Sequence, residues 1–203
     1  ERGDFTGAKD CFERVIQLAS QSEASEVYLY LSKCLFKLGD QQGAMSNVDR
    51  AIKIDSTNIH ARFWKVGLLR QNGNREGALA ELSELAQICY ELMAFHRAGR
   101  KTFDDAINAY LMAADLRANI LMEIGNYEEC NNFLDEMLFQ IPEHATGWYN
   151  KACALAHLKM KKEMLESLKK SILREPSFKL EAKKDKDFQD YWCDDEFNAI
   201  VQD

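Results

Sequence analysis

The sequence lacks the hydrophobic runs and cysteine pairs that mark membrane and metal-binding proteins. No segment reaches 18 consecutive apolar residues, which argues against a transmembrane helix. No C-x-x-C pair or other cluster of ligands is present, and the four histidines are scattered, so we expect no zinc site. Isolated thiols are typical of buried, reduced cysteines in an intracellular protein, and we expect a cytoplasmic location. The six cysteines are Cys11, Cys34, Cys89, Cys130, Cys153 and Cys193.

Catalytic signatures are also missing. The chain has no glycine-rich phosphate loop, no G-x-S-x-G or H-E-x-x-H sequence, and no paired carboxylates in an apolar setting. We therefore expect no catalytic residue, no metal and no cofactor.

Basic residues are fewer than acidic ones, 26 against 33, and the net charge is −7. Nucleic-acid binding needs a basic face, so this balance argues against it. The charge is uneven: residues 145–186 carry eleven basic and five acidic side chains, whereas residues 187–203 carry six acidic and no basic ones. The alternation suits docking of the acidic tail on the basic block, an acidic peptide partner, or a plain solvated surface.

Only two prolines are present, and one of them, Pro176, ends the clearest pattern in the chain, residues 145–178. Two runs of apolar residues at helical spacing are separated there by a link too short for anything but a tight turn. The two helices must be antiparallel, and each leaves an apolar face bare, so the hairpin needs copies stacked beside it. The apolar residues are Trp148, Ala152 and Leu155 in the first run and Met164, Leu168 and Ile172 in the second.

Copies of this hairpin recur with a period of 34 residues: Pro176 steps back to Pro142, and Ala152 to Ala118. A 34-residue period with W-x2-L-G-x2-Y, A-x3-F and P is the tetratricopeptide repeat (TPR) pattern. The chain resembles this family over nearly its whole length, which implies an all-α, right-handed solenoid of stacked antiparallel helix pairs. The resemblance is carried by Trp148, Ala152, Leu155, Met164, Leu168 and Pro176, and in an earlier copy by Tyr28, Leu31, Ser32, Leu35, Ala44 and Val48.

The resemblance divides the chain into a TPR array at 1–178 and a capping segment at 179–203. Residues 1–20 resemble the second half of a repeat, with Ala8 and Phe12 at the A-x3-F spacing, so we expect a longer parent chain with further repeats upstream. The capping segment resembles the polar terminal helix of such arrays. Complete repeats are expected at about 25–58, 59–86, 87–115, 111–144 and 145–178.

One spacing breaks the period. The equivalent positions Ala106 and Cys130 lie 24 residues apart, whereas a helix, a turn, a second helix and a second turn need about 30 residues. Either residues 103–124 form one continuous helix, or residues are missing from the chain near Asp115–Arg117. We favour missing residues.

In this family the first helices of the repeats line a concave face that holds peptides. The resemblance therefore implies a partner-binding groove on the side of these helices opposite their packing face. Lys183 and Lys184 of the capping segment would add a basic lip. The other candidates are Tyr30, Lys33, Lys37, His60, Trp64, Asn119, Tyr149, Asn150 and His157.

Asn119 and Asn150 match two asparagines that, in related domains, hold the backbone or terminal carboxylate of a peptide. An amide can donate and accept at once, so it holds a peptide bond without reading its side chain. Chaperone-binding domains add basic residues, whereas Asp115 occupies the place of the first lysine here. A clamp, a generic peptide-holding role and plain solvation all stay open. Tyr149 and Trp64 are candidate groove anchors, with packing on a neighbouring hairpin as the alternative.

The sequence thus predicts a non-catalytic scaffold that binds an extended or helical segment of a partner protein in its concave groove. Two alternatives stay open. The array could recruit substrates for an enzyme whose catalytic domain lies upstream, or it could be a structural subunit that packs through its second helices or its ends. The sequence names neither the partner nor the oligomeric state.

Overall fold

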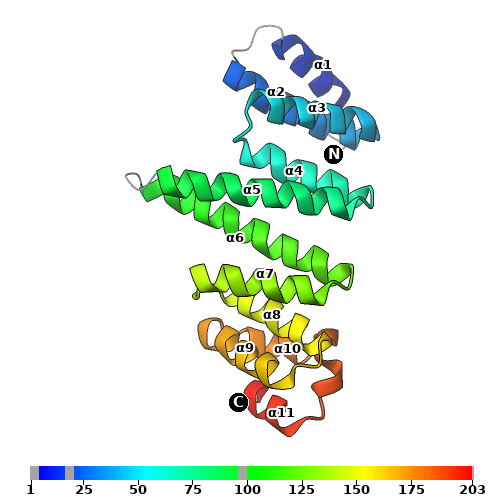
Figure 1. Cartoon of the computed structure of the whole chain (residues 1–203). Coiled ribbons are helices and arrows are strands. Elements are labelled where there is room, and N and C mark those ends of the chain that lie inside the picture. Colours follow the sequence, from blue (N-terminus) through cyan, green and yellow to red (C-terminus); the bar gives the residue numbers. More distant parts are fainter. Residues whose placement is uncertain (1–4, 17–20, 96–99, 203) are drawn as a thin grey trace. The chain divides into compact units, whose positions relative to one another are not determined.

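The computed structural model describes residues 5–16, 21–95 and 100–202, which are mostly helical and contain no strand (Figure 1). Within these ranges, no helix combines the length and apolarity needed to cross a membrane. The elements are α1 (Phe5–Ile16), α2 (Gln21–Lys37), α3 (Gln41–Ile54), α4 (Ile59–Gln71), α5 (Arg75–Phe95), α6 (Arg100–Glu123), α7 (Tyr127–Gln140), α8 (Ala145–His157), α9 (Lys161–Arg174), α10 (Phe178–Ala182), the 3-10 helix η1 (Lys186–Tyr191) and α11 (Asp195–Val201).

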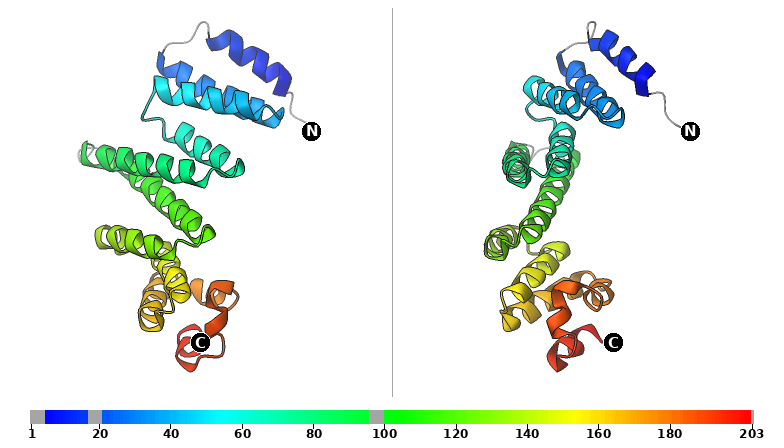
Figure 2. Two further views of the ribbon diagram at one scale, coloured as in Figure 1. Left: turned by 45° about the vertical axis from the view of Figure 1, so that its right-hand side comes forward. Right: turned by 90° about the vertical axis from the view of Figure 1, so that its right-hand side faces the viewer.

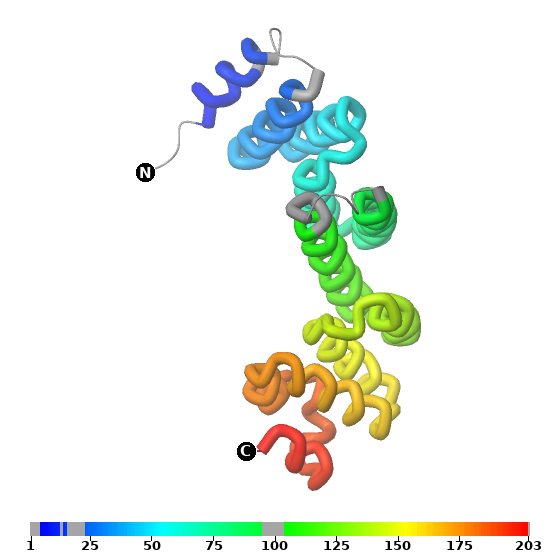
Figure 3. Tube along the Cα trace, turned by 90° about the vertical axis from the view of Figure 1, so that its left-hand side faces the viewer, coloured from blue at the N-terminus to red at the C-terminus, as the bar shows by residue number. Residues whose placement is uncertain are grey.

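The chain divides into two compact units, Glu1–Tyr110 and Leu111–Asp203. In the first unit α2 lies between α1 and α3 (Figure 3), and α4 packs against α3 and α5. In the second unit α7, α8 and α9 pack in succession, and α10, η1 and α11 lie against α8 and α9 (Figure 2). Consecutive helices therefore form the expected pairs, and the predicted all-α solenoid fold is confirmed.

A two-part signal sets the turns within these pairs. One residue adopts a left-handed conformation, which glycine tolerates best. The next residue is an Asp or Asn whose side chain accepts a hydrogen bond from a backbone N–H three residues further on, which satisfies one free amide of the new helix. The left-handed residues are Gly39, Gly73, Gly125 and Lys159, and the first three precede the caps Asp40, Asn74 and Asn126.

α6 is longer than an ordinary repeat helix: it runs without interruption for 24 residues. Residues 103–123 thus lie in one continuous helix, as in the first of the two arrangements that the short spacing allowed. No glycine or proline occurs between residues 101 and 123 to end the helix earlier. The overlapping repeats expected at 87–115 and 111–144 share α6, and residues 87–95 belong to α5.

The capping segment is part of the core of the second unit. Phe188 and Phe197 are fully buried and pack with the apolar residues of α8 and α9. Outside this core, Lys161 Nζ lies 2.7 Å from Asp194 Oδ2 and 2.9 Å from Glu196 Oε1, and Lys159 pairs with Asp190. The acidic tail therefore docks on the basic block, which is one of the three uses that the charge pattern allowed.

Candidate protein-binding site

An open apolar hollow of about 360 Å³ lies between α1 and α2 in the first unit. We call it the α1–α2 hollow. Burial raises the pKa of the Cys34 thiol, so this part of the lining is neutral at physiological pH. Its lining consists of Phe5, Ala8 and Phe12 from α1, and Tyr30, Lys33, Cys34 and Lys37 from α2.

Three of the predicted binding residues meet at this hollow. The Tyr30 ring stacks on the ring of Phe12, with 5.9 Å between the centroids, and Tyr30 still exposes 48% of its surface. Lys33 Nζ lies 5.3 Å from the centroid of the Tyr30 ring and 5.9 Å from that of Trp64. These cation–π contacts hold an ammonium group beside the apolar lining. Lys37 lines the hollow one helical turn further along.

Trp64 and His60 contribute less to this surface. Trp64 is half-buried: its Nε1 donates a 2.8 Å hydrogen bond to Ser32 Oγ, and its ring meets the edge of Phe36. Trp64 therefore packs on the neighbouring hairpin, the alternative raised above. His60 is exposed near the start of α4 and does not line the hollow.

The other candidates belong to the second unit, where the cap covers part of α8. Tyr149 is only 7% exposed, its ring stacks on Phe178, and its hydroxyl donates a 2.9 Å hydrogen bond to Asp185 Oδ2. His157 Nε2 lies 2.9 Å from Asp187 Oδ1, and its ring stacks on Tyr127. Of the two roles left open for Tyr149, groove anchor or packing, the structure thus shows packing, here against the cap.

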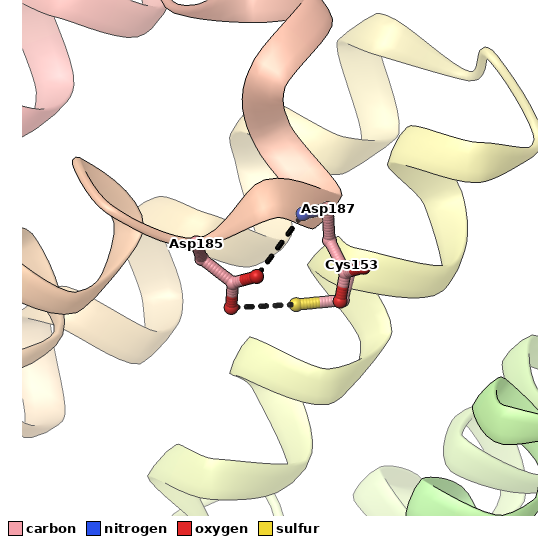
Figure 4. A group of neighbouring side chains, drawn as sticks. All are labelled: Cys153, Asp185 and Asp187. Carbon is pink, nitrogen blue, oxygen red and sulfur yellow. Dashed lines mark hydrogen bonds between the residues drawn. The ribbon is translucent and has the colours of Figure 1, made fainter.

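Cys153, Asp185 and Asp187 form the described group whose ligand atoms lie close enough together, within 4.8 Å, to share a metal ion (Figure 4). The polar atoms bond to one another instead. Asp185 Oδ1 accepts the Asp187 backbone N–H at 3.0 Å, and Asp185 Oδ2 lies 3.9 Å from Cys153 Sγ. Burial raises the pKa of the Cys153 thiol well above its usual value. The contacts among these three residues join the cap, through Asp185, to Cys153 of α8.

The remaining candidates of the second unit differ in their exposure. Asn119 is exposed on α6, whereas Asn150 on α8 has a buried Nδ2 without a hydrogen-bond partner. Asp115, in the place of the expected lysine, is bonded to His144 Nε2 at 2.8 Å. Lys183 and Lys184, both exposed, follow α10.

Sequence reasoning missed two parts of the surface. Phe5, Ala8 and Phe12 line the α1–α2 hollow, although the A-x3-F spacing marks Ala8 and Phe12 as packing residues. It also missed an open polar hollow of about 450 Å³ between α6 and α7. That hollow is lined by Arg117, Asn126, Glu128, Glu129, Asn132, Phe133 and Glu136.

Comparison with known proteins identifies the class. Models of the tetratricopeptide repeat match residues 1–59 and residues 145–178. Together with the helix pairs described above, these matches show that the chain is a TPR superfamily protein. A sequence search of curated proteins found no match.

Several solved structures share the fold. The crystal structure of MamA is 16% identical, covers 87% of this chain and 92% of its own, and has a TM-score of 0.59. A MamA fragment from Desulfovibrio magneticus RS-1 is 13% identical, with coverages of 78% and 80% and a TM-score of 0.55. Acl4, the assembly chaperone of RpL4, is 15% identical, with coverages of 86% and 70% and a TM-score of 0.58. At these identities the likeness concerns the fold alone.

Proposed function

We propose that this chain is a non-catalytic scaffold inside the cell that binds a segment of a partner protein, and that the α1–α2 hollow is a principal contact. The observation that carries the proposal is an open apolar lining with an exposed tyrosine and two lysines on a helical-repeat fold. Exposed apolar patches with charged rims are typical of interaction sites.

The chemistry of the hollow favours a partner segment that is apolar and acidic. Phe5, Ala8 and Phe12 offer apolar contacts, and aromatic anchors such as Tyr30 contribute strongly to binding when a partner excludes water from them. Lys33 and Lys37 make no ion pair with any carboxylate in the described part of the chain. A carboxylate on the partner would pair with these ammonium groups and fix its orientation.

Site-specific photocrosslinking tests this proposal. A benzophenone amino acid replaces Tyr30 in the hollow or, as matched aromatic controls, Tyr90 on α5 and Phe139 on α7. A specific adduct at Tyr30 that disappears in a Lys33→Glu/Lys37→Glu background, with neither control position giving the same adduct, is the expected result. The proposal fails if the adduct at Tyr30 survives the charge reversal or never forms.

The predicted asparagines of the second unit need a separate test. An Asn119→Ala/Asn150→Ala variant, checked by circular dichroism for retained helicity, is compared with the wild type in capturing the partner crosslinked at Tyr30. We expect equal capture, because the hollow does not include either residue. Loss of capture from the folded variant would move the principal contact to the second unit.

One observation favours a second candidate function, that of a structural subunit. Phe139 and Leu173 occupy equivalent positions at the ends of the second helices α7 and α9, and they are 85% and 80% exposed. Exposed apolar residues on second helices are what packing against another subunit requires. In that case the crosslinker at Phe139, rather than at Tyr30, yields the adduct.

A further inference from the structure

The outer sides of α7 and α9 each carry a large, exposed apolar residue at the same position. The second helices of the described pairs share one register, because their fourth residues are all fully buried: Ala44 in α3, Ala78 in α5, Cys130 in α7 and Met164 in α9. In that register Phe139 and Leu173 are both thirteenth residues, and they are 85% and 80% exposed. The thirteenth residues of α3 and α5 are Lys53 and Gln87, which are exposed and polar. The repeat itself therefore does not require an apolar side chain at this position.

Charged side chains surround these two apolar residues, and the sign of the charge differs between the helices. At three positions that are exposed on both helices, α7 carries a carboxylate and α9 carries an ammonium group. These positions lie three, four and eleven residues before Phe139 or Leu173, which places them on the same helical face as the apolar residue. We call the surface formed by these eight residues the α7–α9 face. Its carboxylates are Glu128, Asp135 and Glu136, and its lysines are Lys162, Lys169 and Lys170.

Trp148 of α8 joins the two halves of this face. Lys170 Nζ of α9 lies 4.1 Å from the centroid of the Trp148 ring. Lys151 Nζ of α8 lies 5.5 Å from the same centroid and pairs with Asp135 of α7. The outer sides of α7 and α9 are therefore neighbours over α8. The two helices also run in the same general direction, because α8 turns the chain back between them (Figure 1).

Most charges of the face have no partner within the chain. Its two glutamates, like Lys162 and Lys169, make no ion pair with any residue of the described ranges. Asp135 and Lys170 are the two charges that contact α8. The face thus combines apolar residues with free charges of both signs, as interaction surfaces with a polar rim do.

Two copies of such a face can meet about a two-fold axis in two ways, and the axis repeats every contact. An axis that runs across the helices sets α7 on α7 and α9 on α9, so carboxylates meet carboxylates and lysines meet lysines, which is costly. An axis that runs between the helices, along their common direction, sets α7 of each copy on α9 of the other. In the shared register Glu128 then faces Lys162, and Phe139 meets Leu173. The charge pattern therefore selects the second arrangement.

We propose that two copies of this chain form a symmetric dimer through the α7–α9 face, with α7 of each copy against α9 of the other. Phe139 and Leu173 make the apolar contact, opposite charges flank it, and Glu166 of α9 faces the amide of Asn132, which can donate to it. The face shares no residue with the α1–α2 hollow, so the inference goes beyond the proposed function and does not depend on it. Two 14-residue helices present a face roughly 20 Å long, at the small end of protein interfaces, so the dimer is weak and dissociates on dilution.

Sedimentation velocity of the purified chain at increasing concentration tests the inference. The expected result is a monomer at low concentration that becomes a dimer as the concentration rises. Phe139→Ser and Leu173→Ser should each raise the dissociation constant of the dimer at least about tenfold, because symmetry removes each apolar contact twice. Leu180→Ser is the matched control: this residue of α10 is 60% exposed and lies outside the face, so the dissociation constant stays unchanged. Circular dichroism confirms that each variant remains helical.

Exchange of charges tests the pairing of α7 with α9. Glu128→Lys/Glu136→Lys reverses the sign of the α7 side, and Lys162→Glu/Lys169→Glu reverses that of the α9 side. Each variant alone should lose self-association, because like charges then face each other. An equimolar mixture of the two variants should associate again, since every basic helix can face an acidic one. The association of the mixture should weaken as the salt concentration rises.

Three results would overturn the inference. A chain that stays monomeric at the highest concentration would reject the dimer, and a benzophenone at Phe139 that captures a different protein would then assign the face to another subunit. A dimer whose dissociation constant is unchanged by both serine substitutions would place the contact elsewhere. Failure of the mixed charge variants to associate, although both are folded, would reject the pairing of α7 with α9. None of these measurements involves the partner that crosslinks at Tyr30, so the proposed function is tested separately.

Discussion

At the scale of single residues, the least expected feature is a buried charge network on α4 and α5. Arg62 stands where the repeat has a large aromatic residue, yet it is only 6% exposed. Its guanidinium donates to Glu81 and Glu84, and its Nε donates to the Ser56 carbonyl at 2.8 Å. Lys65 adds a second cation at 3.0 Å from Glu81 Oε2. Burying these charges is tolerable only because each has a partner.

Removing Glu81 should therefore destabilise the first unit. We expect Glu81→Ala to cost about 3–5 kcal/mol, because it leaves the Arg62 guanidinium buried without its main partner. Glu84→Ala is the matched control: its side chain is 67% exposed, so the expected cost is about 0–1 kcal/mol. Urea denaturation measures both. Equal costs for the two variants would contradict a structural role for the buried pair.

The cysteines provide a second residue-scale prediction. Cys11 and Cys193 are exposed, whereas the other four thiols are buried. Burial raises the pKa of Cys89 to about 11 and that of Cys130 to about 12. We expect a disulfide reagent at pH 8 to modify two thiols of the native protein rapidly and all six only after denaturation. Rapid modification of four or more native thiols would show that the core is open.

The same shifts set the direction of the alkaline pH dependence. A thiol with a raised pKa in the folded state keeps its proton while the unfolded chain loses one, so folding is favoured fully only below the unfolded pKa. The contribution of Cys89 and Cys130 is therefore present below about pH 8.5 and is lost as the pH rises toward 11–12.

At the scale of elements, the turns between paired helices depend on backbone conformation. Gly73 has a φ of +74° and an added methyl group would meet no atom within 4 Å, so any cost of a side chain there comes from the backbone alone. Gly67, inside α4, is equally open but lacks a positive φ. A side chain meets no neighbouring atom at either glycine, so the difference between the two substitutions reports the cost of the positive φ at Gly73.

Substituting alanine at these two glycines should have opposite effects. Gly73→Ala should lower the free energy of unfolding by about 1–2 kcal/mol, because a left-handed conformation disfavours a side chain. Gly67→Ala should raise it by about 0.5–1 kcal/mol, since alanine is the better helix former and restricts the unfolded chain. Thermal denaturation of both variants gives the comparison. A stabilising Gly73→Ala would contradict the turn geometry.

Elements with strong local signals could be predicted from the sequence. The fourth-residue register of Ala44 and the turn at Gly39 were visible because both follow from helical spacing and backbone sterics. The length of α6 appeared only as the less favoured of two alternatives, since a run without glycine or proline does not say where a helix ends. The covering of Tyr149 also escaped prediction, because it depends on residues more than 30 positions away in the cap.

Only the α2 side of the α1–α2 hollow could be predicted from the sequence. Tyr30, Lys33 and Lys37 follow from the helical phase of α2, because three- and four-residue spacings place them on a common face. Their apolar counterparts on α1 did not follow. In a complete repeat the residues at the positions of Ala8 and Phe12 are buried. Whether a neighbouring helix covers them depends on tertiary packing, which the spacing of residues within α1 does not reveal.

At the scale of the whole molecule, each unit has its own apolar core, and the cap completes that of the second. Phe188 is fully buried against α8, so Phe188→Ala should cost about 3–5 kcal/mol by leaving a cavity. Phe139→Ala, at an 85% exposed site, should change stability by less than about 0.5 kcal/mol. Tryptophan fluorescence during urea unfolding reports both. A cost near zero for Phe188→Ala would show that the cap is not part of the core.

The central claim is that the scaffold engages its partner at the α1–α2 hollow. Hydrogen–deuterium exchange of the chain, alone and with the partner that crosslinks at Tyr30, tests it most directly. The account predicts that added protection concentrates in α1 and α2, and that Lys33→Glu/Lys37→Glu abolishes it. Protection concentrated in α7 and α9, around Phe139 and Leu173, with α1 and α2 unchanged, would contradict the claim and identify a structural subunit instead.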